Sequence, residues 1–341
     1  MKKLEEFIIE KLKVNKIKPK YKPKDKKELV NLMIKEIQAN GPYCSLNHID
    51  VSDIDDMSYL FGFDDTQYVY GKAGVANFDG DISEWDVSNV TTMKYMFDGC
   101  EYTGKNGDIS YWDVSNVTDM RGMFSKSKYN GDISRWDVSN VKDMALLFYN
   151  SWFTGENGDI SKWDVSKVTE MTYMFGENKY NGDISNWNVS NVENMGSMFF
   201  SSNFNGDLSK WDVSKVANMA EMFRDSKFTG ENGDLSNWNV SKVITMRDMF
   251  RNTKFNNDIS NWDVSNVTHM DRMFYESNFN GDISKWDVSS VIWFNEMFVN
   301  SAFSGDISKW KINPKSQSHM DRMFKGSPLA NNPPDWYYKI L

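Results

Sequence analysis

The chain has 341 residues, more than one compact core usually holds, so its length favours either several domains or one elongated array. Its 13 Trp, 22 Phe and 21 Met, beside only 7 Pro, exclude the disordered and collagen-like classes. The net charge of −9 conceals an asymmetry, because residues 1–40 hold 12 Lys against six acidic residues, a balance of +6 that leaves −15 for the remainder. An acidic body repels phosphates, which argues against nucleic-acid binding there.

The sequence lacks the residues needed for a disulfide framework, a metal centre, a membrane span or a signal peptide. Cys44 and Cys100 cannot build a disulfide framework, and three histidines leave little material for a metal centre. No apolar segment is long enough to span a membrane, and the run Phe7–Ile9 is too short for the core of a signal peptide. The sequence thus contains no signal for export, and the chain is expected to be cytoplasmic and to use no metal or other cofactor.

Residues 1–45 are predicted to form a basic segment followed by a helical cap. Four apolar side chains near the start share one helical face: Leu4, Phe7, Ile8 and Leu12. The basic strip over residues 13–24 contains prolines and is not expected to be helical. A second helix is predicted from a capping box at Asp25 and Glu28 to a stop signal at Asn40–Pro42. This helix would cover the first coil, whereas residues 1–24 would either extend the cap or dock the protein on a larger assembly.

Residues 46–326 consist of about eleven cycles of one repeat, followed by a tail over residues 327–341. Ten tryptophans recur at intervals of 24 or 27 residues, from Trp85 to Trp310. Each cycle reads Asn-Gly-Asp-Ile-Ser-x-Trp-Asp-Val-Ser-x-Val-x-x-Met-x-x-Met-Phe, which makes the chain a repeat protein. Three cycles carry one extra triplet at the same point, as expected of a surface turn: residues 103–106, 154–157 and 229–232.

Two periodicities alternate inside a cycle. Trp136 and Val138 flank Asp137, which predicts a short strand with the two apolar side chains inward and the carboxylate outward. The spacing of apolar residues from Val141 to Phe148 predicts a short helix, with Ser139 as its N-cap. The sequence thus predicts an α/β solenoid of the leucine-rich-repeat type. Each coil of 24–27 residues would hold one short parallel strand and one short helix, with a helical cap at the N-terminal end.

The repeat, written Asp-Ile-Ser-x-Trp-Asp-Val-Ser-Asn-Val-Thr-x-Met-x-x-Met-Phe, resembles that of the BspA-like leucine-rich repeat surface proteins, a family of bacterial lipoproteins and adhesins. The resemblance covers about residues 46–326 and implies a binding or adhesive solenoid on a cell surface, without catalytic residues to carry over. The chain departs from the family because no lipobox cysteine follows a signal peptide and Pro333–Trp336 matches no wall-anchor motif. Similar repeat proteins without export signals occur in gut bacteria and their phages, which implies a virion or intracellular setting as the alternative.

Two columns of polar residues follow from the repeat. An aspartate enters every predicted strand, as Asp132 does, and we interpret it as the acceptor of an Asx turn in preference to a calcium ligand. The second column is expected on the open face of the sheet: Asp86, Asp113, Asp137, Asp164, Asp212, Asp263 and Asp287, with Asn188, Asn239 and Lys311 at the remaining positions. Neighbouring Lys and Arg are expected to relieve its repulsion, and a cationic ligand is the alternative.

Aromatic side chains fall into two groups. The recurring tryptophans keep a fixed place beside Val and Ile, which favours core packing over a carbohydrate platform. Aromatic residues at variable positions are the candidates for contact with a partner: Tyr95, Tyr111, Trp152, Tyr173 and Trp293.

These observations predict a protein that is not an enzyme. The expected function is that of a repeat scaffold for protein–protein or surface recognition, like an adhesin, whose partner is a protein or a surface glycan. The alternative is a structural or accessory component of a larger assembly such as a phage virion. The basic N-terminus would dock on that assembly.

Overall fold

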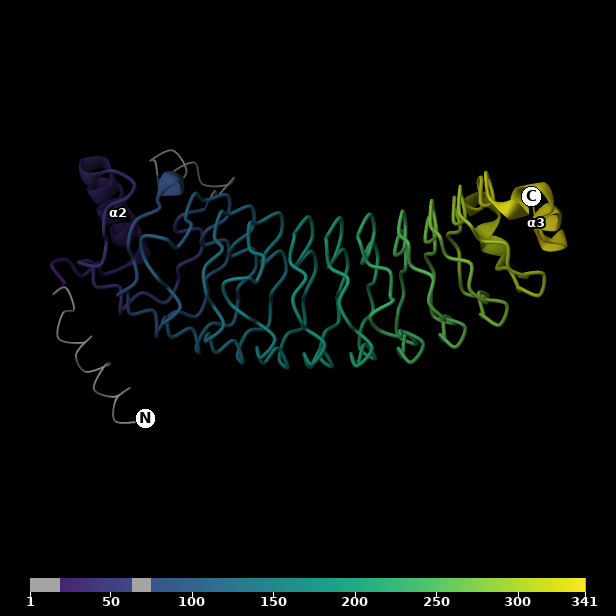
Figure 1. Ribbon diagram of the computed structural model, residues 1–341, viewed down its shortest axis with the longest axis horizontal. Helices are drawn as coiled ribbons and strands as arrows, with labels where there is room; N and C mark the ends of the chain where they lie inside the picture. Colours follow the sequence, from purple (N-terminus) through teal and green to yellow (C-terminus); the bar gives the residue numbers. More distant parts are fainter. Residues whose placement is uncertain (1–18, 63–74, 341) are drawn as a thin grey trace.

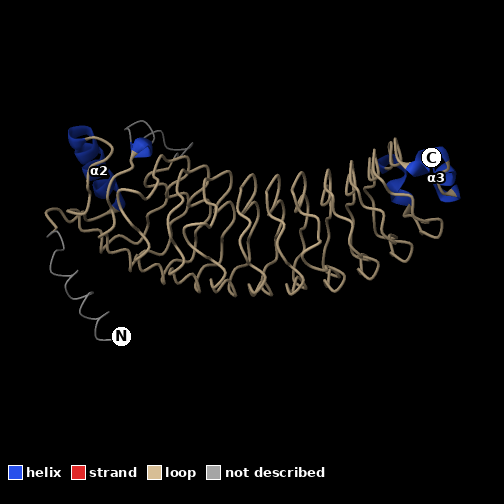
Figure 2. Cartoon of the chain, in the orientation of Figure 1, coloured by secondary structure: helices blue, strands red, loops and turns tan. Residues whose placement is uncertain are grey.

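The computed structural model describes residues 19–62 and 75–340. The chain winds into a long, gently curved stack of similar coils (Figure 1). Regular helices lie at the two ends of the stack, where Figure 2 shows α2 and α3 in blue. Within the described residues the helices are α2 (Lys26–Asn40) and α3 (Asp335–Ile340), with short 3-10 helices at Val75–Asn77, Pro314–His319 and Pro328–Asn331. None of the described helices is long and apolar enough to cross a membrane.

Neighbouring coils are joined by main-chain hydrogen bonds in the segment that contains the methionines. From Asp56 to Trp293, the residue before the first Met position of each cycle forms an isolated parallel bridge to its counterpart in the neighbouring coil, as Asp143 does with Glu170. The ladder continues from there, because the N–H groups of Met144, Leu146 and Phe148 donate to carbonyls of the following coil at 3.0, 2.8 and 3.0 Å. The described coils contain such bridges but no longer strand.

The predicted helix over Val141–Phe148 is wrong. The N–H groups that a helix would bond internally are directed to the next coil, and the chain instead makes successive tight turns. In the first turn the N–H of Leu147 bonds the carbonyl of Met144 at 3.2 Å, with Leu146 at a φ of 60°. Asn150, at a φ of 48°, occupies the same place in the second turn, so both turns have the left-handed third residue of a type II turn.

The predicted strand over Trp136–Val138 is also wrong, because these residues are irregular. The N–H of Trp136 bonds the carbonyl of Ile133 in a turn, and Ser139 bonds Asp137 and caps no helix. The predicted orientations are confirmed, since Trp136 and Val138 are buried and Asp137 is exposed. The wider class, an α/β solenoid of the leucine-rich-repeat type, stays a prediction.

The interior consists of columns of identical or similar side chains that run along the stack. The phenylalanine that ends each Met-x-x-Met-Phe segment stacks on its neighbours, and ring centroids in this column are 6.0 Å apart between Phe124 and Phe148. Each of the ten recurring tryptophans is buried and bonded to the previous coil, as Nε1 of Trp136 donates to the carbonyl of Ile109 at 3.0 Å. Each coil therefore requires its neighbours to bury and bond its own core residues.

The N-terminal cap agrees with the predicted capping signals. The Asp25 side chain accepts the N–H of Glu28, and α2 ends at Gly41 with a φ of 84°. The described end of the basic strip, residues 19–24, lies against the first coil and so extends the cap, because Tyr21 forms a parallel bridge with Ile49. Lys22 also reaches Asp53 at 2.9 Å.

At the other end, the tail continues the interior columns. Nε1 of Trp336 donates to the carbonyl of Ile307 at 2.9 Å, and its ring lies 6.4 Å from that of Trp310. Trp336 thus occupies the place that a tryptophan takes in the ten coils from Trp85 to Trp310, and α3 covers the last coil.

Candidate interaction face

One surface of the stack carries side chains that differ from coil to coil. It is formed by the bridge residue and by the x positions of Met-x-x-Met-Phe-x-x, and we call it the turn face. In one coil the buried residues Met144, Leu147 and Phe148 alternate with partly exposed Leu146 and Tyr149. The turns direct the frame residues inward and the variable residues outward, because the main chain bonds the next coil whatever those side chains are.

Three aromatic residues from successive coils gather on this face, and we call them the aromatic cluster. Tyr173 packs edge-on against Tyr149 at 5.5 Å and against Phe200 at 6.0 Å. Burial, together with a hydrogen bond from its hydroxyl to Glu177, raises the pKa of Tyr149 to about 12. The guanidinium of Arg224 lies 5.2 Å from the centre of the Phe200 ring, which joins the cluster to the charged residues of the following coils.

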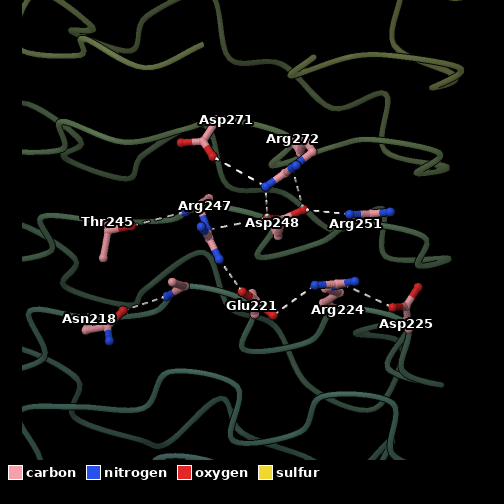
Figure 3. Close-up of polar contacts among 11 residues, drawn as sticks. Asn218, Glu221, Arg224, Asp225, Thr245, Arg247, Asp248, Arg251, Asp271 and Arg272 are labelled. Carbon is pink, nitrogen blue, oxygen red and sulfur yellow. Dashed lines mark hydrogen bonds and ion pairs between the residues drawn. The ribbon is translucent and has the colours of Figure 1, made fainter. Parts of the chain in front are cut away.

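The charged residues form a network around Asp248, drawn in Figure 3. Asp248 is fully buried, and its carboxylate contacts Arg251 at 3.3 Å and Arg272 at 3.1 Å. Arg247 approaches the same carboxylate at 3.5 Å. A buried carboxylate requires such partners, since an unpaired charge in the interior costs several kcal/mol.

The network extends across neighbouring coils on either side of Asp248. Glu221 accepts from Arg247, and this contact raises the pKa of the guanidinium. Glu221 also pairs with Arg224 at 3.0 Å. In the other direction, burial raises the pKa of Asp271, which lies beside Arg272 in the next coil. These five residues, together with Arg251 and Asp248, hold one another in place, so the network presents a fixed pattern of charge.

A concavity of about 340 Å³ lies against the network. Its lining includes Arg247, Asp271 and Trp293. The Trp293 ring lies between two histidines, 5.8 Å from His269 and 3.6 Å from His319. The concavity combines positive charge, negative charge and an aromatic ring. This combination suits contact with a partner whose surface also carries both positive and negative charges.

The predicted contact residues do not form one site. Tyr95, Tyr173 and Trp293 lie on the turn face, but in coils far apart along the stack. Tyr111 and Trp152 are among the most exposed large apolar residues, at 73% and 61%, and they lie outside the turn face. The predicted docking residues Leu4, Phe7, Ile8 and Leu12 lie outside the described residues.

Both aspartate columns are Asx turns. Asp132 accepts the N–H of Ser134 at 2.8 Å, and every aspartate of the first column makes the same bond to the serine two residues on. The second column is exposed as predicted, but it lies on irregular chain and not on the open face of a sheet, and it uses the same bond, at 3.0 Å between Asp137 and Ser139. Within residues 19–62 and 75–340, no group of three or more His, Cys, Asp or Glu could hold a metal ion.

The network around Asp248 was not found from the sequence. Its members come from several coils and share only their positions in the repeat, since Glu221, Asp248 and Arg272 all stand second after the first Met. Tabulating the variable positions coil by coil would have shown this run of charges. Cys100 is buried in the core, and burial raises the pKa of its thiol to about 12.

The comparisons with known proteins match one family model, described as "Mycoplasma protein of unknown function, DUF285". It matches three stretches of the chain, residues 30–151, 150–232 and 225–336. Together the stretches take in most of α2, the coils and Trp336. Searches of curated proteins and of solved structures found no match.

Proposed function

This chain belongs to the DUF285 family of repeat proteins, and on that premise we propose that it is a non-enzymatic scaffold that binds another protein through the turn face. In this proposal the stack is an α/β solenoid of the leucine-rich-repeat type. The coils supply a rigid support, and the variable side chains supply recognition. The resemblance to BspA-like proteins supports an adhesin-like role on a cell surface.

The observation that carries the proposal is the position of the aromatic cluster next to the network around Asp248. Tyr and Arg are the residues most often found at the energetic centres of protein interfaces, together with Trp. Here Tyr173 and Phe200 lie beside Arg224, and none of the three is needed to bury the core.

The ion pairs support the same proposal through preorganisation. Binding is weakened when flexible side chains must be ordered at the interface. Arg247 and Arg272 are already held by Glu221 and Asp248, so a partner would meet guanidinium groups whose positions are fixed. Fixed charges favour one partner over others more than they raise affinity.

The test uses photo-crosslinking of the full chain to its partner in the native cell extract, followed by measured affinity for the purified partner. The double variant Tyr173→Ala, Phe200→Ala should weaken that affinity by about 100-fold, because two central aromatic contacts are removed. The matched control is Tyr111→Ala, an exposed aromatic residue away from the turn face, which should leave the affinity unchanged.

Thermal melting of both variants guards against loss of folding as the explanation. If the partner binds the double variant as tightly as the wild type, the turn face is not the binding surface. A partner on the cell envelope would support the adhesin-like role.

A further inference from the structure

A hollow beside Trp152 lies outside the turn face, and we call it the Trp152 notch. It is a concavity of about 380 Å³ lined by residues of three successive coils. Two of those coils carry the extra triplet, in the turns 103–106 and 154–157, whereas the coil between them, at Lys128 to Gly131, lacks it. The volume falls at the lower end of the range for small-ligand sites.

Trp152 is exposed because of its place in the repeat. It stands between Ser151 and Phe153, which are both buried, so its side chain must be directed outward. The fold does not require a tryptophan there, because other coils have polar or small residues at the same position: Glu101, Lys128, Lys179, Asn203, Lys227, Lys254, Asn278 and Ala302. An exposed indole that the fold does not need suggests a role in binding.

The walls of the notch are held in place before any ligand arrives. The N–H of Trp152 donates to the carbonyl of Ser127 at 3.0 Å. The side-chain amide of Asn157 donates to the carbonyl of Asn130 at 2.6 Å and fixes one turn on the coil before it. Gly104, with a φ of 79°, gives the other turn its shape. A ligand would therefore meet a site that needs little ordering.

The charge of the notch is opposite to that of the body. Lys105 and Lys128 line it, and no Asp or Glu is among its lining residues, although the chain after residue 40 carries −15. The Lys128 amine lies 5.5 Å from the centre of the Trp152 ring and also pairs with Glu101, whereas Lys105 is exposed. This arrangement favours an anionic ligand.

We propose that the Trp152 notch binds an acidic sugar, a pyranose unit of a glycan that carries a carboxylate. The C–H groups on one face of a pyranose ring bear partial positive charge and stack on the electron-rich face of an indole. Trp152 supplies that surface, Lys105 and Lys128 attract the carboxylate, and Asn157 and Thr103 offer side-chain oxygens to the sugar hydroxyls. This binding goes beyond protein recognition at the turn face and does not depend on it.

The experiment measures binding of three oligosaccharides to the full chain by calorimetry. The acidic probes are 3′-sialyllactose, which ends in a sialic acid, and a hyaluronan tetrasaccharide, which contains uronic acids; lactose is the neutral counterpart. At least one acidic probe should bind, and lactose should bind about 10-fold more weakly or not at all. The two acidic probes distinguish a terminal sugar from a polymer as the source.

Trp152→Ala should weaken binding of the acidic probe by about 10-fold or more. Lys105→Gln should weaken it by about 3-fold and reduce the preference for the acidic probe over lactose. Tyr111→Ala is the matched control, because Tyr111 is also exposed and has Arg135 at 5.1 Å from its ring, but it does not line the notch. This variant should bind as the wild type does.

The proposal is overturned if neither acidic probe binds the wild type, if lactose binds equally well, or if Trp152→Ala binds unchanged. Each variant is first checked by circular dichroism and thermal melting. The Tyr173→Ala, Phe200→Ala variant should keep full sugar binding, so failure of protein recognition and failure of sugar binding can be told apart.

Discussion

The turn face and the side that carries the exposed aspartate column differ in how the same coil is held together. At the column, a side chain stabilises the backbone, as Asp137 does by accepting the N–H of Ser139. At the turn face, the backbone bonds the backbone of the next coil, as Leu146 does with Thr172 at 2.8 Å. The fold therefore restricts the residue type at positions where a side chain closes a turn. It tolerates many residue types at positions where only the main chain bonds the next coil.

Substitution of a buried residue that recurs along the repeats should lower the unfolding free energy more than any other single substitution. Trp136→Ala should lower the free energy of unfolding by about 3–5 kcal/mol, because it opens a cavity and leaves the carbonyl of Ile109 without its indole donor. Asp137→Asn should change it by less than about 0.5 kcal/mol, since asparagine makes the same bond at Asn188. Urea denaturation of both variants measures the difference, and a more damaging aspartate change would reverse our assignment of inside and outside.

Most substitutions on the turn face should change stability little, but substitutions in the network around Asp248 should lower it. Asp248→Asn keeps the shape of the side chain but removes the charge shared by three partly exposed arginines, and we expect a loss of about 2 kcal/mol in unfolding free energy. Asp225→Asn is the control, because Asp225 also has a positive φ and pairs with Arg224, but its side chain is 30% exposed. Its loss should stay below about 1 kcal/mol. If chemical denaturation gave the two variants the same loss of unfolding free energy, the burial of Asp248 would not increase its contribution to stability.

The left-handed turn positions should restrict what the turn face accepts. Ser201 is exposed, with a φ of 50°, and its N–H donates to the carbonyl of Arg224. Ser201→Val should lower the unfolding free energy by about 1–2 kcal/mol, because a β-branched residue is strained in this region. Ser201→Gly should be neutral or raise it by about 0.5 kcal/mol. Melting temperatures would contradict this account if the two variants behaved alike.

The aspartate turns should make the smallest contribution per residue, visible as a pH dependence. Hydrogen bonds from the serine two residues on lower the pKa of Asp183, Asp258, Asp282 and Asp306. A lowered folded-state pKa means that their stabilisation is complete above about pH 4 and is lost as the pH falls through the lowered values. The melting temperature should therefore fall below about pH 4 and change little from these groups between pH 5 and 7.

The matched variant replaces these four aspartates with asparagine, which closes the same turn without titrating. Its melting temperature should fall less steeply below about pH 4 than that of the wild type. Identical curves would show that other carboxyl groups determine the acid response.

Much of the frame could be predicted from the repeat, because burial and side-chain turns depend on residues close in sequence. The inward direction of Trp136 and the Asx turn at Asp132 needed no knowledge of another coil. The helix cap at Asp25 also depends only on residues close in sequence, because Asp25 bonds the N–H of Glu28.

The helix expected from Val141 to Phe148 failed for the opposite reason. The spacing of three and four residues fits a helix and a pair of tight turns equally well, and the choice depends on whether Met144 donates within its own coil or to Glu170, 26 residues on. The site was hidden in the same way, since Asp248 is paired with Arg272 of the next coil. Strand and helix patterns describe one segment at a time and cannot show such partners.

Trp336 has a consequence for how the array can evolve. It binds the carbonyl of Ile307, a group for which the repeat supplies a counterpart in every coil. The packing of α3 on the last coil therefore does not depend on which coil comes last. Loss or duplication of one whole cycle in the gene would leave this packing intact. The number of coils can change without redesign of the end, while an event located between two surface sites changes the spacing between them. Gene rearrangement could thus produce new combinations of surface sites on an unchanged scaffold.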